Sequence, residues 1–336
     1  MSRPQKKQKI CRPRRKKVQA LIDKVYLAPL AGITDAAMRS VCRDFGCTLA
    51  YTEMVSAKAV TFGDKKTFNL ARIGADEGNV SLQIFGSEPQ IMARAAHTLE
   101  RGYSAEGFVP PVAIDINMGC PVHKIFSNGE GSALMRDPDL IYRITKSVKE
   151  NISIPVTVKI RSGVDENHIN AVECAMAAES AGASLVTVHG RTRTMLYSGS
   201  ADREVIKNVK NNLHIPVVAN GDVTDVASAL SMLRETGADG IMIGRGAVGN
   251  PYLFSQIRAA LEGGEFLSPT LEERRITALL QLKLAIEDKG ETVAVNEARK
   301  QIAIYFKGFR GCASLRAKIN AATTYAEVEA ALEEDK

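Results

Sequence analysis

Polar residues recur where short apolar segments end, and their types could support cofactor binding and proton transfer. Seven apolar segments in succession carry such residues at or just beyond their C-terminal ends. These are Glu53, Gln83, Asn117, Lys159 with Arg161, His189, Asn220 and Arg245. An apolar segment buries well without a polar group, and an unpaired buried polar group is costly. The repetition therefore indicates one site that collects the ends of several strands.

Two of these segments carry residues that could act in chemistry directly. Lys159 lies inside Val156–Ile160, where an ammonium group needs a partner. It could form a Schiff base or stand as a fixed cation beside an anionic ring, although a strand-end lysine can also extend to solvent. Cys120 lies in a tight Gly-Cys-Pro sequence. Its thiol, with an ordinary pKa of about 8.5, could serve as an acid, although a lone cysteine is often a small buried apolar residue.

Two glycine-containing turns follow the last two apolar segments. They read Asn220-Gly221-Asp222 and Gly244-Arg245-Gly246. Glycine lets a backbone approach a ligand closely, and barrels often bind phosphate after their late strands. We therefore expect a phosphorylated cofactor or substrate here; turns that only reverse the chain are the alternative. We expect no metal site, because no carboxylates cluster and Cys120 with His123 supplies two ligands where a structural zinc site has four.

The segments that position these residues alternate between strand and helix patterns. The expected strands are Val25–Pro29, Leu49–Glu53, Val80–Ile84, Ala113–Asn117, Pro155–Ile160, Leu185–Val188, Pro216–Ala219 and Gly240–Ile243. The expected helices between them include Ala36–Phe45, Pro89–Arg101, Pro138–Asn151, Ile169–Ala181, Asp225–Thr236 and Pro251–Leu261. Such alternation indicates parallel βαβ units, and eight of them predict a closed (β/α)8 TIM barrel. A doubly wound sheet is the alternative, although it more often has a GxGxxG turn after its first strand.

The pattern changes after residue 262, so we predict an α/β barrel over 18–262 and an all-helical domain over 271–336. Residues 263–270 contain two glycines, a serine and a proline, which is typical of a linker. Beyond the linker no strand pattern returns. Helices are expected at Leu271–Lys289, Val295–Phe306 and Ala326–Glu333.

The helical domain contains a basic stretch. Residues 299–318 include six basic, three aromatic and no acidic residues. This composition is typical of nucleic-acid binding; a helix with aromatic residues in its core and solvated charges is the alternative.

The net charge of +6 is concentrated at the N-terminus. Residues 1–17 carry nine basic and no acidic residues, which leaves 35 basic against 38 acidic side chains in the rest of the chain. RNA binding would therefore need local basic patches. We expect residues 1–17 to form a disordered leader, either a solvated tail or an arm that contacts RNA.

The sequence favours a cytoplasmic protein. It has no run of about 18 apolar residues, and no apolar segment follows the basic N-terminus, so we expect neither a membrane span nor a secretion signal. Six cysteines without a CxxC spacing favour a reduced setting. Nothing in the sequence indicates an obligate protein partner.

Several of these motifs resemble those of the tRNA-dihydrouridine synthases. Ala28–Asp35 resembles the APMAGVTD opening of that family, and Asp115–Pro121 resembles its catalytic loop. Other similar elements are His189–Arg193, both glycine turns, and Arg299-Lys300 followed by Tyr305, Lys307 and Gly308. The resemblance covers residue 24 to the C-terminus and is greatest to the bacterial B subfamily. Two departures are Leu30, where the family usually has methionine, and the basic leader.

The resemblance implies FMN in the mouth of the barrel. The isoalloxazine ring is expected to meet Pro29, Leu30 and Ala31, and Gln83 to bond its polar edge. Lys159 is expected near N1 and the C2 carbonyl, and His189 near the ribityl chain. The expected phosphate ligands are Asn220, Gly221, Asp222, Gly244 and Arg245.

The resemblance also implies a reaction in two halves. NADPH, or less readily NADH, reduces the flavin; the flavin then passes hydride from N5 to C6 of a uracil in the D-loop of tRNA, and Cys120 protonates C5. Asn117 is expected to read the uracil edge. Further RNA contacts are expected from Lys124, Arg191, Arg193, Arg299, Lys300, Lys307, Arg310 and Arg316.

Two other functions fit part of the sequence. An FMN barrel oxidoreductase for a small molecule, such as a dihydroorotate dehydrogenase or an ene-reductase, would share the cofactor residues but would not need a basic helical domain. A non-catalytic RNA-binding protein on a barrel scaffold would not need Cys120, Lys159 or the phosphate turns.

Overall fold

The computed structural model describes residues 24–102 and 109–333, so the predicted leader over 1–17 lies outside the described residues. Eight parallel strands pair in a closed ring, because β1 pairs with both β2 and β9 and β2 pairs with β4. The strands are β1 (Val25–Leu27), β2 (Leu49–Tyr51), β4 (Val80–Phe85), β5 (Ala113–Met118), β6 (Val156–Arg161), β7 (Leu185–His189), β8 (Val217–Asn220) and β9 (Gly240–Ile243). The predicted (β/α)8 barrel is confirmed, and the doubly wound sheet is wrong because an open sheet leaves two edge strands.

One short strand was not predicted. β3 (Val55–Ser56) lies just beyond β2 and pairs in parallel with the end of β4. It extends the rim of the barrel outside the ring of eight.

The two faces of each strand differ in what they contact. On β5, Ile114, Ile116 and Met118 belong to the large apolar core between the strands and the surrounding helices. A smaller apolar cluster fills the barrel interior and draws on Leu49, Ala113 and Leu185, each the first residue of its strand. The interior is therefore apolar where strands begin, which leaves their C-terminal ends for polar groups.

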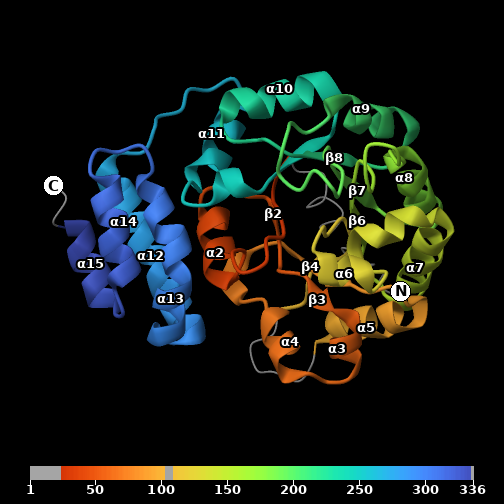
Figure 1. Cartoon of the computed structure of the whole chain (residues 1–336), viewed down its shortest axis with the longest axis horizontal. Helices are drawn as coiled ribbons and strands as arrows, with labels where there is room; N and C mark the ends of the chain where they lie inside the picture. The colour runs from red at the N-terminus through yellow and green to blue at the C-terminus, as the bar shows by residue number, and fades with distance from the viewer. Residues whose placement is uncertain (1–23, 103–108, 334–336) are drawn as a thin grey trace, which may run out of the picture.

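The helices outside the barrel follow the predicted ones closely (Figure 1). They are α2 (Ala36–Asp44), α5 (Pro89–Arg101), α7 (Pro138–Asn151), α8 (Ala171–Ser180), α9 (Arg203–Asn212), α10 (Val226–Thr236) and α11 (Tyr252–Leu261). Short helices α3 (Ala57–Thr61), α4 (Lys65–Leu70) and α6 (His123–Ser127) occupy loops near the rim. None of the helices in the described ranges combines the length and apolar character needed to cross a membrane.

The C-terminal region is entirely helical over its described residues and packs beside α2 and α11 (Figure 1). It comprises α12 (Leu271–Lys289), α13 (Glu291–Ile302), the 3-10 helix η4 (Ala303–Phe306), α14 (Cys312–Ala321) and α15 (Tyr325–Glu333). The predicted helix Val295–Phe306 starts four residues earlier and ends in the 3-10 turn, and α14 was not predicted. Ala37 and Tyr252 of the barrel share one apolar core with these helices.

Polar contacts also join the helical region to the loop after β1. Lys289 on α12 forms an ion pair with Asp35, with 2.5 Å between Nζ and Oδ2. Gln301 donates from Nε2 to the carbonyl oxygen of Ile33 at 3.4 Å. Because Leu30 and Ala31 stand in the same loop, the helical region supports the rim at the point where a flavin ring is expected.

A buried ion pair holds the other side of that loop. Arg39 on α2 and Glu77 are each 2% exposed, with 2.5 Å between Arg39 Nε and Glu77 Oε2. Arg39 also donates to the carbonyl oxygens of Thr34 (2.7 Å) and Arg72 (3.0 Å). The second carboxylate oxygen of Glu77 accepts the N–H of Gly74 at 2.6 Å. Both charges are thus paired and hydrogen-bonded, as burial requires.

We expect Arg39→Met to lower the free energy of unfolding by about 3–5 kcal/mol, because it leaves the Glu77 carboxylate buried without its partner. Chemical denaturation measures this change. Arg43→Met on the same helix removes an exposed pair with Asp44 and should cost less than about 1 kcal/mol. Equal losses of unfolding free energy in the two variants would contradict the importance of the buried Arg39–Glu77 ion pair for stability.

Candidate active site

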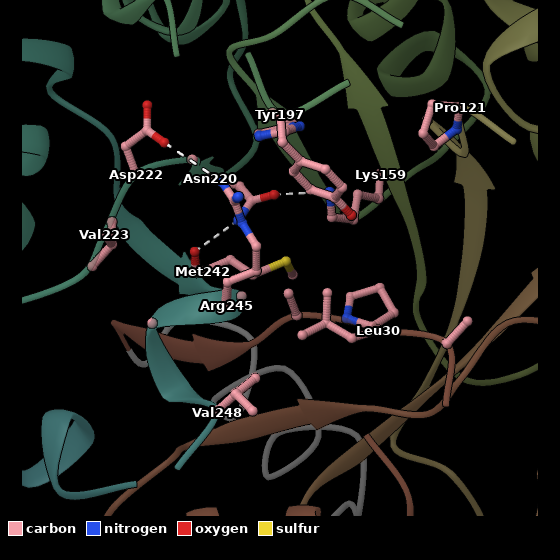
Figure 2. Close-up of a pocket in the computed structure, with 18 of the residues that line it drawn as sticks. Leu30, Pro121, Lys159, Tyr197, Asn220, Asp222, Val223, Met242, Arg245 and Val248 are labelled. Atoms are coloured by element: carbon pink, nitrogen blue, oxygen red, sulfur yellow. Dashed lines mark hydrogen bonds and ion pairs between the residues drawn. The ribbon is translucent and has the colours of Figure 1, made fainter. Parts of the chain in front are cut away.

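A cavity of about 920 Å³ opens at the C-terminal ends of the strands. All of the predicted cofactor residues line it, together with Asn117 and Cys120. They are Pro29, Leu30, Ala31, Gln83, Lys159, His189, Asn220, Gly221, Asp222, Gly244 and Arg245. Figure 2 shows side chains from both halves of the barrel facing this space, including Leu30, Lys159 and Arg245. The structure therefore brings together residues up to 216 positions apart, from 29 to 245.

Lys159 is held in the cavity by Asn220. Its Nζ donates to Asn220 Oδ1 at 2.9 Å, and Asn220 Nδ2 donates to the carbonyl oxygen of Met242 at 2.8 Å (Figure 2). Burial, followed by the positive charge of Arg161, lowers the pKa of Lys159 to about 7. An anion placed beside Lys159 would favour its charged form, so the residue is suited to stabilise a negative ligand.

His189 is neutral in this environment. Burial is the main cause that lowers its pKa to about 2, and the positive charges of Lys159 and Arg161 add to it. The imidazole of His189 lies under Gly221, whose φ is 126°. A Cβ at Gly221 would stand 2.6 Å from Ala201 Cβ and 3.1 Å from His189 Cδ2, so the turn admits glycine alone.

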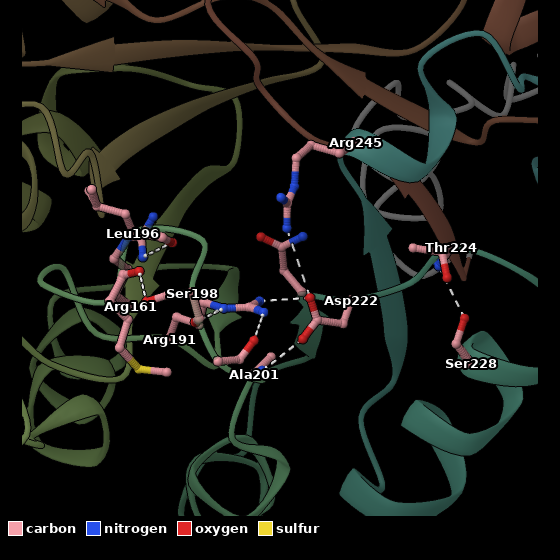
Figure 3. A network of polar contacts seen from close by, with 12 residues as sticks. Arg161, Arg191, Leu196, Ser198, Ala201, Asp222, Thr224, Ser228 and Arg245 are labelled. Atoms are coloured by element: carbon pink, nitrogen blue, oxygen red, sulfur yellow. Dashed lines mark hydrogen bonds and ion pairs between the residues drawn. The ribbon is translucent and has the colours of Figure 1, made fainter. Parts of the chain in front are cut away.

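Asp222 organises the turn after β8 (Figure 3). Its Oδ1 accepts from Arg191 Nη1 at 2.7 Å and its Oδ2 accepts the N–H of Ala201 at 2.8 Å. Although burial raises the pKa of Asp222, the bond from Arg191 and the other contacts outweigh it, and the pKa is lowered. Arg245 is 3.9 Å from Asp222 and stacks 4.3 Å above the ring of Tyr197. The guanidinium of Arg245 is thereby placed beside the turn and remains half-exposed.

Cys120 is buried to 8% exposure in a loop that is anchored at its backbone. The carbonyl oxygen of Cys120 accepts from Ser132 Oγ at 2.7 Å, and that of Gly119 accepts from Arg161 Nε at 2.8 Å. The N–H of Cys120 donates to Asn117 Oδ1 at 2.9 Å. Burial raises the pKa of the Cys120 thiol. The thiol is therefore protonated at neutral pH, which suits a proton donor.

Some of the predicted RNA-contacting residues have other partners. Arg191 was expected to hold RNA, but its side chain is 3% exposed and is bonded to Asp222 and to the carbonyl oxygens of Ser198 and Gly199, because it braces the turn. Asn117, predicted to read uracil, is 8% exposed and uses both amide atoms within the protein. Arg193 stacks 3.6 Å from the centre of the Phe126 ring.

The remaining predicted RNA contacts comprise one residue that is bonded within the protein and five that are exposed. Arg299 donates to the carbonyl oxygen of Ala322 at 2.6 Å and so joins α13 to the end of α14. The other members are exposed: Lys124, Lys300, Lys307, Arg310 and Arg316. Among them Lys307 lines the cavity, whereas Lys124, Arg193, Arg299, Lys300, Arg310 and Arg316 are not among its lining residues.

Sequence reasoning missed two residues of the helical region that line the cavity, Arg274 and Ile304. Arg274 on α12 donates from Nη1 to the carbonyl oxygen of Tyr305 at 3.0 Å and lies 5.3 Å from the ring of Phe309. Its place on the cavity side of α12 depends on how the helix packs against the barrel, so no local signal marks it.

The cavity favours anions. Among the described residues that line it there are five cationic side chains and a single carboxylate, that of Asp222. The cations are Lys159, Arg161, Arg245, Arg274 and Lys307. In the described part of the chain, no three His, Cys, Asp or Glu side chains come close enough to hold a metal ion.

Fold and site together define a barrel protein with a cation-rich cavity, suited to an anionic ligand, where its strands end. The dihydrouridine synthase (Dus) family matches residues 26–336, and the chain belongs to this family. It is 40% identical over 307 residues to a tRNA-dihydrouridine synthase B of Xanthomonas axonopodis pv. citri, covering 91% of this chain and 90% of that protein. It is 39% identical over 302 residues to a probable tRNA-dihydrouridine synthase of Rickettsia conorii, with 89% of each chain covered.

Among solved structures, histamine dehydrogenase from Rhizobium sp. 4-9 has a similar fold. The TM-score is 0.53 at 13% sequence identity, and the match covers 78% of this chain and about half, 49%, of that chain. This similarity concerns the barrel architecture alone.

We expect the Nζ of Lys159 to titrate with a midpoint near pH 7 in the protein without ligand, because burial and Arg161 disfavour the ammonium form. The charged fraction then falls as the pH rises through this value. NMR of protein labelled with 13C at lysine Cε measures the midpoint, with Lys159→Gln to assign the signal. Addition of FMN should raise the midpoint; one near the ordinary lysine value of about 10.4 without ligand would contradict the description.

Proposed function

We propose that the protein is a flavin-dependent oxidoreductase that reduces uridine to 5,6-dihydrouridine in the D-loop of tRNA, with FMN as cofactor and NADPH as reductant. Family membership over residues 26–336 supports the substrate and the reaction class. The observation that carries the proposal is the meeting of Cys120, Lys159 and the glycine turns of β8 and β9 in one cation-rich cavity.

The residues of the cavity fit FMN. A Cβ added to Gly244 would lie at ordinary contact distance from Ala28 Cβ (3.8 Å) and Leu30 Cδ2 (3.9 Å), so this turn lies close to the loop that is proposed to meet the flavin ring. Arg245 stands beside the turns with its guanidinium accessible, which suits a terminal phosphate. Pro29, Leu30 and Ala31 supply a mostly apolar wall for a planar ring. The volume of about 920 Å³ lies near the upper end of the range for ligand and cofactor sites, about 300–1,000 Å³, which suits a cofactor together with a base.

When bound, FMN would supply hydride for C6 of the uracil after NADPH has reduced it. Lys159 would hold a positive charge against the ring system and stabilise negative charge that develops there. His189 would be a neutral neighbour of the flavin, so the positive charge beside the ring would come from Lys159. The turns at Gly221 and Gly244, with Arg245, would hold the phosphate.

Cys120 would complete the reaction by giving its proton to C5 of the uracil. Two backbone anchors, from Ser132 and Arg161, fix the loop. Burial keeps the thiol protonated until negative charge develops on C5 of the bound uracil. Proton transfer at C5 and hydride addition at C6 together convert the C5–C6 double bond into a single bond.

The target uridine would leave its stack to reach this cavity, which costs a few kcal/mol. The exposed cations of the helical region provide a surface for the RNA backbone, and Lys307 with Arg274 carries that surface into the cavity. Contacts to phosphate at the mouth would offset the cost of unstacking.

Replacement of Cys120 by Ala should slow the reduction of uridine by about 10²–10⁴-fold, the usual contribution of a general acid. Reduction of the flavin by NADPH should stay near the wild-type rate, because that half of the reaction needs no proton at C5. Stopped-flow absorbance of the flavin measures each half separately. Equal loss in both halves would contradict the role of Cys120.

The variant Lys307→Ala/Arg310→Ala should bind unmodified tRNA more weakly and reduce the slope of log affinity against log salt by about one unit for each lost phosphate contact. Fluorescence anisotropy between low and moderate salt measures the slope. Lys146→Ala on α7, outside the helical region, is the matched control and should leave it unchanged. A wild-type slope in the double variant would exclude these two side chains as phosphate contacts.

A further inference from the structure

Asp115 is a buried carboxyl group to which the proposed reaction gives no task. It lies on β5, is 0% exposed, and stands between Thr157 and Gln83 in the barrel interior. Thr157 Oγ1 donates to its Oδ1 at 2.5 Å and Gln83 Nε2 donates to its Oδ2 at 2.7 Å. Burial raises the pKa of Asp115 to about 6, so the group is a carboxylate at neutral pH. A barrel interior normally holds apolar residues, and a buried charge is costly.

A continuous chain of hydrogen bonds leads from Asp115 to the backbone of Cys120. Gln83, bonded to Asp115 through Nε2, accepts from Asn117 Nδ2 at its Oε1, with 2.8 Å between the atoms. Asn117 Oδ1 accepts the N–H groups of Gly119 at 3.1 Å and Cys120 at 2.9 Å. Two side-chain amides thus connect the carboxylate to the loop that carries the thiol.

The direction of every bond in this chain is set from its two ends. A carboxylate only accepts, so Gln83 must turn its NH2 group toward Asp115 and its oxygen toward Asn117. A backbone N–H only donates, so Asn117 must turn its oxygen toward Gly119 and Cys120 and its NH2 group toward Gln83. The two requirements agree, and a single orientation of both amides satisfies them. An apolar residue at 115 would remove one of the two constraints.

We propose that Asp115 is a positioning residue for Cys120: acting through Gln83 and Asn117, it fixes the loop that aims the thiol at the substrate. This inference rests on the proposed function of Cys120 as proton donor. It also means that Asn117 uses its amide atoms to hold the chain. Only the weak contact from Asn117 Nδ2 to Met54 Sδ, at 3.5 Å, could be replaced by a hydrogen bond to a substrate.

The loop has anchors that do not involve Asp115, namely Ser132 on the carbonyl oxygen of Cys120 and Arg161 on that of Gly119. Loss of Asp115 should therefore leave the loop folded and change the direction of the thiol. A displacement of about 1 Å is enough to cost about 10²-fold in rate.

The test compares Asp115→Leu with Asp115→Asn in the FMN-loaded protein. Asparagine keeps an oxygen that accepts from Gln83 Nε2 and can donate to Thr157, so it preserves the chain of hydrogen bonds. Leucine leaves the NH2 group of Gln83 without this acceptor and so releases one end of the chain. We expect Asp115→Leu to slow the reduction of uridine about 10- to 100-fold, and Asp115→Asn to restore a rate within about threefold of wild type. Flavin reduction by NADPH should change little in either variant. Thr187→Val is the matched control, because its hydroxyl is buried in the same interior and takes no part in the chain from Asp115 to Cys120.

A second measurement does not depend on turnover. The rate at which iodoacetamide alkylates Cys120, followed by mass spectrometry with and without FMN, reports the accessibility and orientation of the thiol. This rate should change in Asp115→Leu and match wild type in Asp115→Asn and Thr187→Val. If Asp115→Leu gives no folded protein by circular dichroism, Asp115→Val, a smaller residue suited to a strand, takes its place.

The outcomes separate the two proposals. Failure of the wild-type FMN-loaded protein to reduce any uridine would overturn the proposed function itself, and intact uridine reduction in Cys120→Ala would overturn the role of Cys120 on which this inference rests. If Cys120→Ala loses that step while Asp115→Leu keeps wild-type rates and alkylation, the inference on Asp115 alone is overturned. Equal loss of both half-reactions in Asp115→Leu, with no recovery in Asp115→Asn, would also overturn it, because that pattern indicates a general structural defect.

Discussion

All eight strands run in one direction and close on themselves, so every strand ends at the same rim. Strand pairing then decides which side chains meet across that rim. Gln83 lies opposite Asp115 and Asn117 lies opposite Lys159 in the register of β4, β5 and β6. His189 on β7 lies opposite Asn220 on β8. The site depends on this register, because a shift of one residue would turn each of these side chains from the interior to the outer face.

The interior of the barrel changes from apolar to charged along the strands. Leu49, Ala113 and Leu185 fill it where strands begin, and Lys159, Arg161 and His189 stand where strands end. Burial, followed by the positive charge of neighbouring side chains, lowers the pKa of Lys159 and of His189. The same charge makes the space attractive to anions, and an anion bound there would offset the electrostatic cost of gathering the charge.

Much of the barrel and of the lining of the cavity could be predicted from the sequence, because strand patterns and glycine turns are local and the fold brings strand ends together. What the sequence did not show depends on partners distant in the chain. Arg191 was expected to contact RNA, but its guanidinium forms an ion pair with Asp222, which lies 31 residues later in the chain. The cavity position of Arg274 follows from the packing of α12 against α2. α14 lacks a clear apolar periodicity, so its helix was not predicted.

The central claim is that this cavity reduces a uridine of tRNA with electrons from a flavin. The most direct test incubates the purified FMN-loaded protein with unmodified tRNA and NADPH and measures the mass of each nucleoside afterwards. The account predicts a gain of about 2 Da at a D-loop uridine, the mass of one hydride and one proton. If NADPH reduces the flavin and every uridine keeps its mass, the protein acts on a different substrate and the account is wrong.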